Sequence, residues 1–232
     1  MNIESQRIEA LRSRIATACR AAGREPASVR LLAVSKRQSA ARVRAFYLAG
    51  QRAFGENVLQ EARAKQPQLA NLDIEWHFIG HIQSNKTAEL AGHFQWVQSV
   101  DRERVLRRLA DQRPADLPPL RILLQVNIDR EPQKSGAMPE QLAALAELAA
   151  RLPGIDCRGL MAIPRLTGEP DLARDSFRRV RERYLELRAA GHDFDTLSMG
   201  MSADLEWAIA EGSTMVRVGT DLMGPRNTAP GP

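Results

Sequence analysis

Short apolar runs alternate with longer segments of helical periodicity along the 232 residues of this chain. Each run contains Leu, Val, Ile or an aromatic side chain, as the buried strands of parallel sheets do. The pattern predicts eight strands, at residues 30–35, 52–55, 75–79, 95–100, 120–127, 156–163, 196–199 and 215–219.

The segments between the strands repeat apolar residues every three or four positions, which predicts helices. These helices cover residues 40–49, 102–112, 139–152 and 171–190. A further amphipathic helix is predicted at the start of the chain, because Ile8, Leu11 and Ile15 share one face with Ala18. Gly23 is placed to end that helix.

Eight strands alternating with helices predict an α/β fold, a single (β/α)8 TIM-type barrel with an extra N-terminal helix. The alternative is an open doubly wound sheet, which usually has a Gly-rich turn after its first strand; here that turn is Ser35-Lys36-Arg37-Gln38. No linker or repeat divides the chain. We therefore expect residues 1–232 to form one domain, with residues 227–232 as a flexible tail.

The net charge of +5, from 33 basic and 28 acidic residues, suits an anionic small ligand and does not require nucleic acid. The most basic stretch, residues 174–188, mixes arginine with glutamate as the wet face of a helix does. Cys19 and Cys157 lie far apart and outside any C-x-x-C motif, which is typical of reduced thiols in the cytoplasm. We find no signal peptide and no apolar run near the roughly 20 residues that span a bilayer, and expect a cytoplasmic protein without a membrane segment.

Lys36 ends the first predicted strand, after Leu31-Leu32-Ala33-Val34-Ser35, and is one of only four lysines in the chain. An ammonium group beside an apolar interior tends to lose its proton, and the neutral amine condenses with aldehydes. Pyridoxal 5'-phosphate (PLP) is the commonest aldehyde cofactor. The alternative is a snorkelling side chain in contact with solvent.

Two further strand ends carry groups suited to a phosphate. Barrels commonly bind phosphate in the loops after strands seven and eight, with backbone N–H groups and a short helix N-terminus. Ser202 is placed to begin such a helix, Gly219 permits close backbone approach, and Thr220 offers a hydroxyl. Taken separately these residues are a helix cap and a turn, but together with Lys36 they favour an aldehyde that bears a phosphate.

Arg217 lies on the last predicted strand, near the mouth of the barrel. An arginine beside a pyridine nitrogen keeps that nitrogen unprotonated, because two adjacent cations repel each other, and the pyridine is then a poor electron sink. The alternative role is a structural salt bridge. His77 and His81 are four residues apart without an H-E-x-x-H helix, so a metal site is not expected.

Several blocks in order resemble the pyridoxal phosphate homeostasis proteins, the YggS/PROSC-type family. The resemblance runs over residues 3–226. Its matching blocks are residues 33–36 (AVSK), 54–57 (FGEN), 76–86 (WHFIGHIQSNK), 125–127 (QVN), 159–161 (GLM), 198–202 (SMGMS) and 216–220 (VRVGT).

The resemblance implies a barrel like the N-terminal domain of bacterial alanine racemase, with PLP held as a Schiff base, the internal aldimine, on Lys36. It further implies that Ser202, Gly219 and Thr220 hold the phosphate and that Arg217 faces the pyridine nitrogen. Asn57 and Met201 complete the expected cofactor-binding set, although a packing role is the alternative for Met201. The chain departs from the family pattern at Val58, where an aromatic residue often stands, and at Asp221, where a small apolar residue is more usual. An inward Asp221 carboxylate would weaken phosphate binding.

We therefore expect a non-catalytic protein that buffers or delivers PLP. The rival interpretation is a PLP-dependent amino-acid racemase, which needs a second base; the resembling enzymes take it from a tyrosine of an added β-domain. Tyr47 and Tyr184, the only tyrosines, lie in helical segments expected outside the barrel. Expected partners are PLP, the apo-enzymes that accept it, and amino acids as weak external-aldimine ligands. We expect no nucleic acid, no membrane and no metal, and a monomer.

Overall fold

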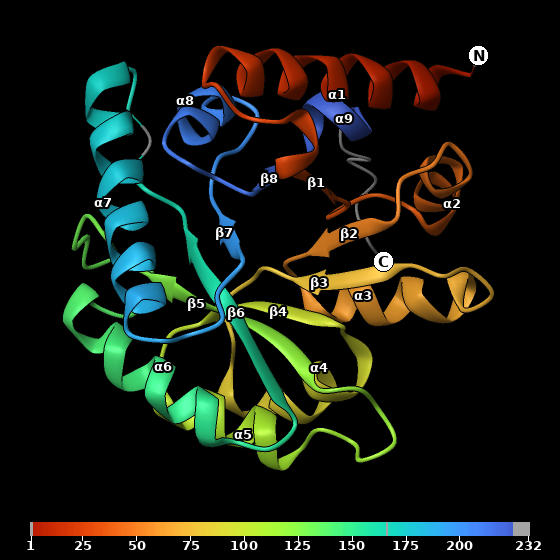
Figure 1. Cartoon of the computed structure of the whole chain (residues 1–232). Helices are drawn as coiled ribbons and strands as arrows, with labels where there is room; N and C mark the ends of the chain where they lie inside the picture. Colours follow the sequence, from red (N-terminus) through yellow and green to blue (C-terminus); the bar gives the residue numbers. More distant parts are fainter. Residues whose placement is uncertain (1, 166, 225–232) are drawn as a thin grey trace.

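Eight parallel strands close into a barrel in the computed structural model, which describes residues 2–165 and 167–224. Each strand pairs with its neighbours in sequence, and β8 pairs with β1 to close the ring (Figure 1). The strands are β1 (Arg30–Val34), β2 (Ala53–Glu56), β3 (Glu75–Phe78), β4 (Trp96–Val100), β5 (Leu120–Val126), β6 (Ile155–Ala162), β7 (Thr196–Ser198) and β8 (Met215–Val218). The predicted barrel is confirmed, and an open doubly wound sheet is excluded.

Helices follow the strands and cover the outside of the barrel (Figure 1). They are α1 (Ile3–Ala21), α2 (Ala40–Leu48), α3 (Leu59–Lys65), α4 (Thr87–His93), α5 (Glu103–Asp111), α6 (Leu142–Arg151), α7 (Pro170–Ala189), α8 (Leu205–Ala210) and α9 (Thr220–Met223). Short 3₁₀ turns are η1 (Pro26–Ser28), η2 (Gln66–Leu69), η3 (Ser84–Lys86) and η4 (Pro139–Gln141). The sequence did not predict α3, α4 and α9, because two turns or fewer leave too few positions to establish a helical period.

The predicted N-terminal helix is confirmed as α1, which lies across α8 and α9 (Figure 1). Its buried face includes Ile8, Leu11 and Ile15. The Asn2 side chain caps its start by accepting from the Ser5 N–H at 2.8 Å. Gly23 follows its end with a φ of 67°, the left-handed conformation that glycine adopts without strain.

The apolar core lies between the strands and the surrounding helices, where Phe46 of α2, Phe54 of β2 and Phe177 of α7 are almost fully buried. No described helix is long and apolar enough to cross a membrane. The predicted flexible tail, residues 227–232, lies outside the described residues.

Candidate functional site

The C-terminal ends of β1 and β8 open into a pocket of about 230 Å³. Six of the seven side chains or backbone positions predicted for a cofactor line this pocket: Lys36, Met201, Ser202, Arg217, Gly219 and Thr220. They come from the first and last strands and from the loop after β7, which the closure of the barrel brings together. The predicted convergence of these segments is therefore observed.

Lys36 lies two residues beyond the end of β1, where the chain turns away from the barrel. The Ser35 N–H donates to Gly55 O at 2.9 Å, and the Gln38 N–H donates to Ser35 O at 3.1 Å. Arg37 completes this turn with a φ of 58° and donates its N–H to Glu61 Oε2 at 2.7 Å. The Lys36 side chain is half-buried and forms no hydrogen bond or ion pair within the described part of the chain. Its amine is thus positioned by a fixed turn and is not engaged by a carboxylate.

Arg217 forms the inner wall of the pocket and is buried. Its Nη1 donates to Ser198 Oγ at 2.7 Å, and its Nη2 donates to Ala162 O at 2.8 Å. Burial lowers the pKa of Arg217 to about 10, and the nearby Asp204 carboxylate opposes that change. The guanidinium therefore stays charged at neutral pH, in a side chain that lines the pocket. Arg217 forms no salt bridge among the described residues, where its partners are a hydroxyl and a carbonyl, so the structure does not support the structural salt bridge.

The loop after β7 is held close to α8 by its backbone. Gly200 has a φ of 92°, and a Cβ there would lie 2.5 Å from the Ala208 Cβ. The prediction that Ser202 begins the next helix is wrong, because α8 starts at Leu205 and Asp204 precedes it as the N-cap residue. Asp204 instead accepts the Met201 N–H at 2.6 Å, which folds the loop back before the helix begins. Ser202 still lines the pocket.

The loop after β8 continues directly into α9, whose first residue is Thr220. Gly219 precedes the helix, and its carbonyl accepts from the Leu222 and Met223 N–H groups at 3.1 and 2.8 Å. The first N–H groups of a helix have no partner within the helix, and here they lie beside the pocket. A bound anion would satisfy them.

Asn57 does not line the pocket, unlike the other predicted residues. It directly follows β2, the strand that pairs with β1 through Val34 and Gly55. Its Oδ1 atom is buried without a hydrogen-bond partner among the described residues. A buried acceptor without a partner is one that a hydrogen-bonding ligand would satisfy.

A buried ion pair beneath Lys36 was missed from the sequence. Lys65 Nζ donates to Glu56 Oε1 at 2.6 Å and to Ser35 O at 2.8 Å, and Ser35 Oγ also donates to Glu56 Oε1 at 2.6 Å. Burial raises the pKa of Glu56, and Lys65 opposes that shift. The signal in the sequence was a glutamate directly after the apolar residues of the second predicted strand, because a carboxylate buried there needs a cation nearby.

Neither departure from the family pattern enters the pocket. Asp221 is exposed, and its Oδ2 lies 3.5 Å from Arg14 Nη1 of α1. The possibility of an inward carboxylate is therefore excluded. Val58 is exposed at the start of α3.

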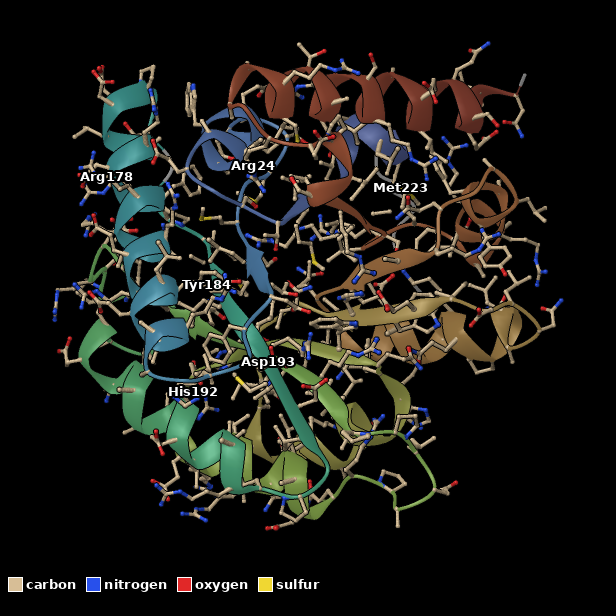
Figure 2. The ribbon with its side chains drawn as sticks, viewed as in Figure 1. Arg24, Arg178, Tyr184, His192, Asp193 and Met223 are labelled. Carbon is tan, nitrogen blue, oxygen red and sulfur yellow. The ribbon has the colours of Figure 1, made fainter. Side chains whose placement is uncertain are left out.

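Both tyrosines lie on covering helices, as predicted. Tyr184, on α7, donates its hydroxyl to Phe194 O at 3.0 Å between the helix and the strands (Figure 2). Tyr47 of α2 accepts the Asp73 N–H at 3.2 Å. Neither tyrosine lines the pocket between β1 and β8.

The arginine-rich helix α7 pairs its charges along its own surface, as the mixed sequence predicted. Arg178 on the outer side of α7 (Figure 2) pairs with Asp175. Arg183 pairs with Glu186 at 2.7 Å. The two histidines at residues 77 and 81 do not converge, and no cluster of metal-binding side chains occurs in the described residues.

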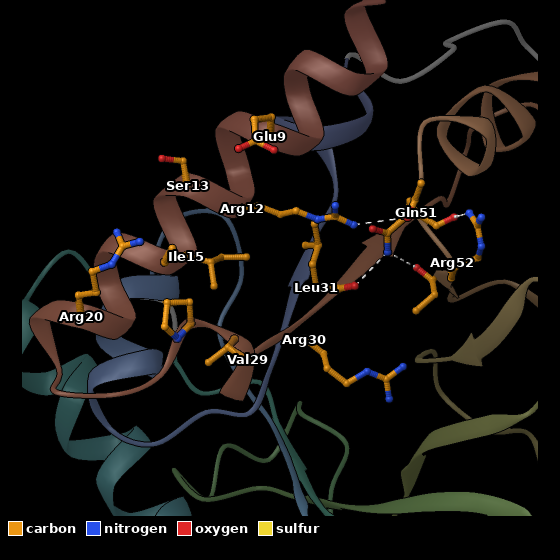
Figure 3. A pocket seen from close by; sticks show the side chains of 14 residues that line it. Glu9, Arg12, Ser13, Ile15, Arg20, Val29, Arg30, Leu31, Gln51 and Arg52 are labelled. Carbon is orange, nitrogen blue, oxygen red and sulfur yellow. Dashed lines mark hydrogen bonds between the residues drawn. The ribbon is translucent and has the colours of Figure 1, made fainter. Parts of the chain in front are cut away.

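A larger cavity, of about 620 Å³, lies at the opposite end of the barrel, between α1 and the starts of β1 and β2. Figure 3 shows that its lining is dominated by Arg12, Arg20, Arg30 and Arg52, with Gln51 hydrogen-bonded to the strand backbone. It contains no lysine. Volume alone therefore does not identify the site of aldehyde chemistry.

Comparison with known proteins identifies the family. The family model described as "Alanine racemase, N-terminal domain" matches residues 7–227. A pyridoxal phosphate homeostasis protein of Pseudomonas aeruginosa is 55% identical over 227 residues, covering 98% of this chain and 97% of the relative. The homeostasis protein of Escherichia coli K12 is 44% identical over 230 residues, covering 98% of both chains. This chain belongs to the pyridoxal phosphate homeostasis protein family.

Solved structures agree with this family assignment. PipY of Synechococcus elongatus PCC7942, solved with PLP bound, is 38% identical with a TM-score of 0.84, covering 95% of this chain and all of PipY. Alanine racemase of Corynebacterium glutamicum is 16% identical with a TM-score of 0.66, and the match covers 60% of the racemase. That second likeness shows the barrel fold alone. The pyridoxal phosphate homeostasis family and its racemase-like barrel, both expected from the sequence blocks, are confirmed.

Proposed function

We propose that this protein binds PLP in the pocket between β1 and β8, as a Schiff base on Lys36, and buffers or delivers it. One observation carries the proposal: Lys36 lines this pocket and has no carboxylate partner within the described residues, whereas every other lysine has one. The partners are Glu56 for Lys65 at 2.6 Å, Glu89 for Lys86 at 3.0 Å and Glu131 for Lys134 at 2.5 Å. A paired ammonium keeps its proton, and only the neutral amine attacks an aldehyde.

The surrounding groups fit the parts of the cofactor. Ser202, Thr220 and the first N–H groups of α9 supply hydrogen-bond donors suited to a phosphate, with Gly219 leaving room for it. Arg217 would face the pyridine nitrogen, Met201 would pack beside the ring, and Asn57 would use its unpartnered oxygen. When bound, the cofactor supplies the aldehyde. Lys36 would hold the cofactor through a C=N bond from its Nζ to the aldehyde carbon, with the aldehyde oxygen lost as water.

A carrier accounts for the pocket better than a racemase does. Lys36 and Arg217 are the only titratable side chains lining the described pocket, so no second base stands opposite the lysine. Arg217 disfavours protonation of the pyridine nitrogen, which limits the stabilisation of a carbanion. A Schiff base reverses on addition of water, so the same linkage that stores the cofactor permits its release to an apo-enzyme. The family's homeostasis name supports this role.

Titration with PLP, followed by absorbance, tests the binding site. The wild type should develop a near-visible imine band, and Lys36→Ala should lack it while Lys134→Ala keeps it. A band of equal strength in Lys36→Ala would contradict the proposal.

The carrier role has its own two assays. Loaded protein mixed with a PLP-free aminotransferase should restore its activity, and L-alanine should exchange its Cα proton for deuterium only slowly by NMR. A turnover near the ~10 s⁻¹ typical of enzymes would favour the racemase instead. The predicted monomer remains a prediction.

A further inference from the structure

The interior of this barrel contains a row of polar side chains, although barrel interiors are usually filled by branched apolar residues. His77 on β3, Gln98 on β4, Ser198 on β7 and Arg217 on β8 are each at most 4% exposed. In a closed barrel, β3 and β4 lie across the interior from β7 and β8 (Figure 1). Buried polar groups are costly unless they are hydrogen-bonded, so their contacts require an account.

These side chains form one unbroken chain of hydrogen bonds that crosses the barrel. Arg217 Nη1 lies 2.7 Å from Ser198 Oγ, and Ser198 Oγ lies 2.8 Å from Gln98 Oε1. Gln98 Nε2 lies 2.9 Å from His77 Nδ1, and His77 Nε2 lies 2.7 Å from Glu75 Oε1. Glu75 begins β3, at the end of the barrel opposite the pocket. The chain thus joins the two ends of the barrel.

The direction of every bond follows from the chemistry of its members. A guanidinium only donates, so Ser198 Oγ accepts from Arg217, and its own proton goes to Gln98 Oε1. The amide nitrogen of Gln98 then donates to His77 Nδ1. His77 must therefore carry its proton on Nε2, which donates to Glu75. Reversing the Gln98 amide would leave the Ser198 hydroxyl proton without this acceptor.

Charged side chains lie at both ends of this chain of hydrogen bonds. Glu75 Oε1 lies 2.5 Å from Arg30 Nη2, and its Oε2 lies 3.4 Å from Arg121 Nη1, so the carboxylate is ionised at neutral pH. Burial lowers the pKa of His77, so the ring is neutral, and it stacks on Trp96 with centroids 5.2 Å apart. Bonds that all run from a cation to an anion polarise one another in the same direction.

We infer that Ser198, Gln98 and His77 are positioning residues that form a hydrogen-bond relay between Arg217 and Glu75. Through this relay, ligand binding at Arg217 alters the hydrogen bonding of His77 at the far end. This inference rests on the proposed function, because Arg217 is the only member that lines the cofactor pocket. A purely structural network would satisfy the same buried groups without responding to a ligand in the pocket.

Nitrogen-15 NMR of the histidine rings tests the relay, with His77 assigned by its loss in His77→Gln. Without ligand, His77 should be protonated on Nε2 and unprotonated on Nδ1. Addition of PLP should shift the His77 Nδ1 signal. Ser198→Ala should change that signal in the unliganded protein, abolish the ligand-induced shift and weaken PLP binding about tenfold, roughly the value of one hydrogen bond.

Ser213→Ala is the matched control. Ser213 is also fully buried, and its hydroxyl donates to Met199 O at 2.7 Å, but it does not belong to the relay. It should leave the His77 signals and the affinity for PLP unchanged.

Three results would overturn the relay: a proton on His77 Nδ1 at neutral pH, an unchanged His77 signal in wild type that visibly binds PLP, or equal weakening in Ser198→Ala and Ser213→Ala. Absence of any absorbance change with PLP would contradict the proposed function instead. The unliganded spectra of wild type and Ser198→Ala would then still test the coupling between Ser198 and His77, and an unchanged His77 signal in Ser198→Ala would overturn the relay.

Discussion

Lys65→Met should be strongly destabilising, because it removes the cation that is hydrogen-bonded to the buried carboxylate of Glu56. Glu56 is fully buried, and its Oε2 already lacks a hydrogen-bond partner among the described residues. The substitution would leave its Oε1 with the Ser35 hydroxyl alone, at 2.6 Å. The Ser35 carbonyl would lose a bond of 2.8 Å in the same step.

The magnitude follows from the burial of the pair. Lys65 and Glu56 side chains are 7% and 0% exposed, and breaking such a pair by removing one partner costs about 3–5 kcal/mol. At about 2–4 °C for each kcal/mol in a protein of this size, Tm should fall by roughly 6–20 °C. Part of the loss should be recovered in Lys65→Met/Glu56→Gln, because no unpaired charge then remains in the interior.

Urea unfolding followed by circular dichroism measures this free energy directly. Lys86→Met is the control, because its pair with Glu89 is partly exposed, at 36% and 25%, and should cost under about 1 kcal/mol. If Lys65→Met were no more destabilising than Lys86→Met, the buried pair would not support the end of β1, and our account of how Lys36 is positioned would be refuted.

Two further predictions concern the phosphate end of the pocket and the response to pH. Ser202→Ala with Thr220→Val should weaken PLP binding at least about tenfold in equilibrium titrations, since each bond to phosphate contributes about 1.5–3 kcal/mol. Pyridoxal without phosphate should be nearly unaffected, and equal weakening of both ligands would show that these hydroxyls do not contact phosphate. The free energy of unfolding, measured with urea from pH 7 to pH 3, should fall steadily as the solution becomes more acidic. Burial lowers the pKa of His77 below its ordinary 6.5, so below pH 6.5 the unfolded chain binds the proton more readily than the folded one. For Glu75 burial is outweighed by His77 and Arg30, which lower the pKa to about 2, so its stabilisation is present above pH 4.5 and is lost between pH 4.5 and 2. His77→Gln should flatten the profile between pH 6.5 and 4.5, and an unchanged slope there would contradict the assignment.

The barrel and most of the pocket could be predicted because they depend on local patterns. Apolar runs locate the strands, and parallel closure places Lys36 and Arg217 at the same mouth without further information. The error at Ser202 is also local. Asp204 competes for the same loop by accepting the Met201 N–H, so the helix begins later than the serine suggests.

The contacts inside the barrel could not be predicted in this way. Gln98 meets Ser198 only because β4 and β7 face each other at a particular stagger, and one residue of slip would point either side chain outward. The pairing of Lys65 with Glu56 likewise depends on how α3 packs on β2, which no period in the sequence encodes. Both contacts adjoin residues that the sequence did identify. Ser198 accepts a hydrogen bond from Arg217, and Lys65 donates to the carbonyl of Ser35, next to Lys36.

Reduction of the PLP-loaded protein with borohydride, followed by peptide mapping, tests the central claim most directly. Borohydride fixes a C=N bond as a stable amine, so the modified lysine reports where the cofactor was held. We expect the pyridoxyl group on the peptide that contains Lys36, and no fixed label in Lys36→Ala. A main adduct on Lys65, Lys86 or Lys134 would contradict the assignment of the pocket between β1 and β8 as the cofactor site.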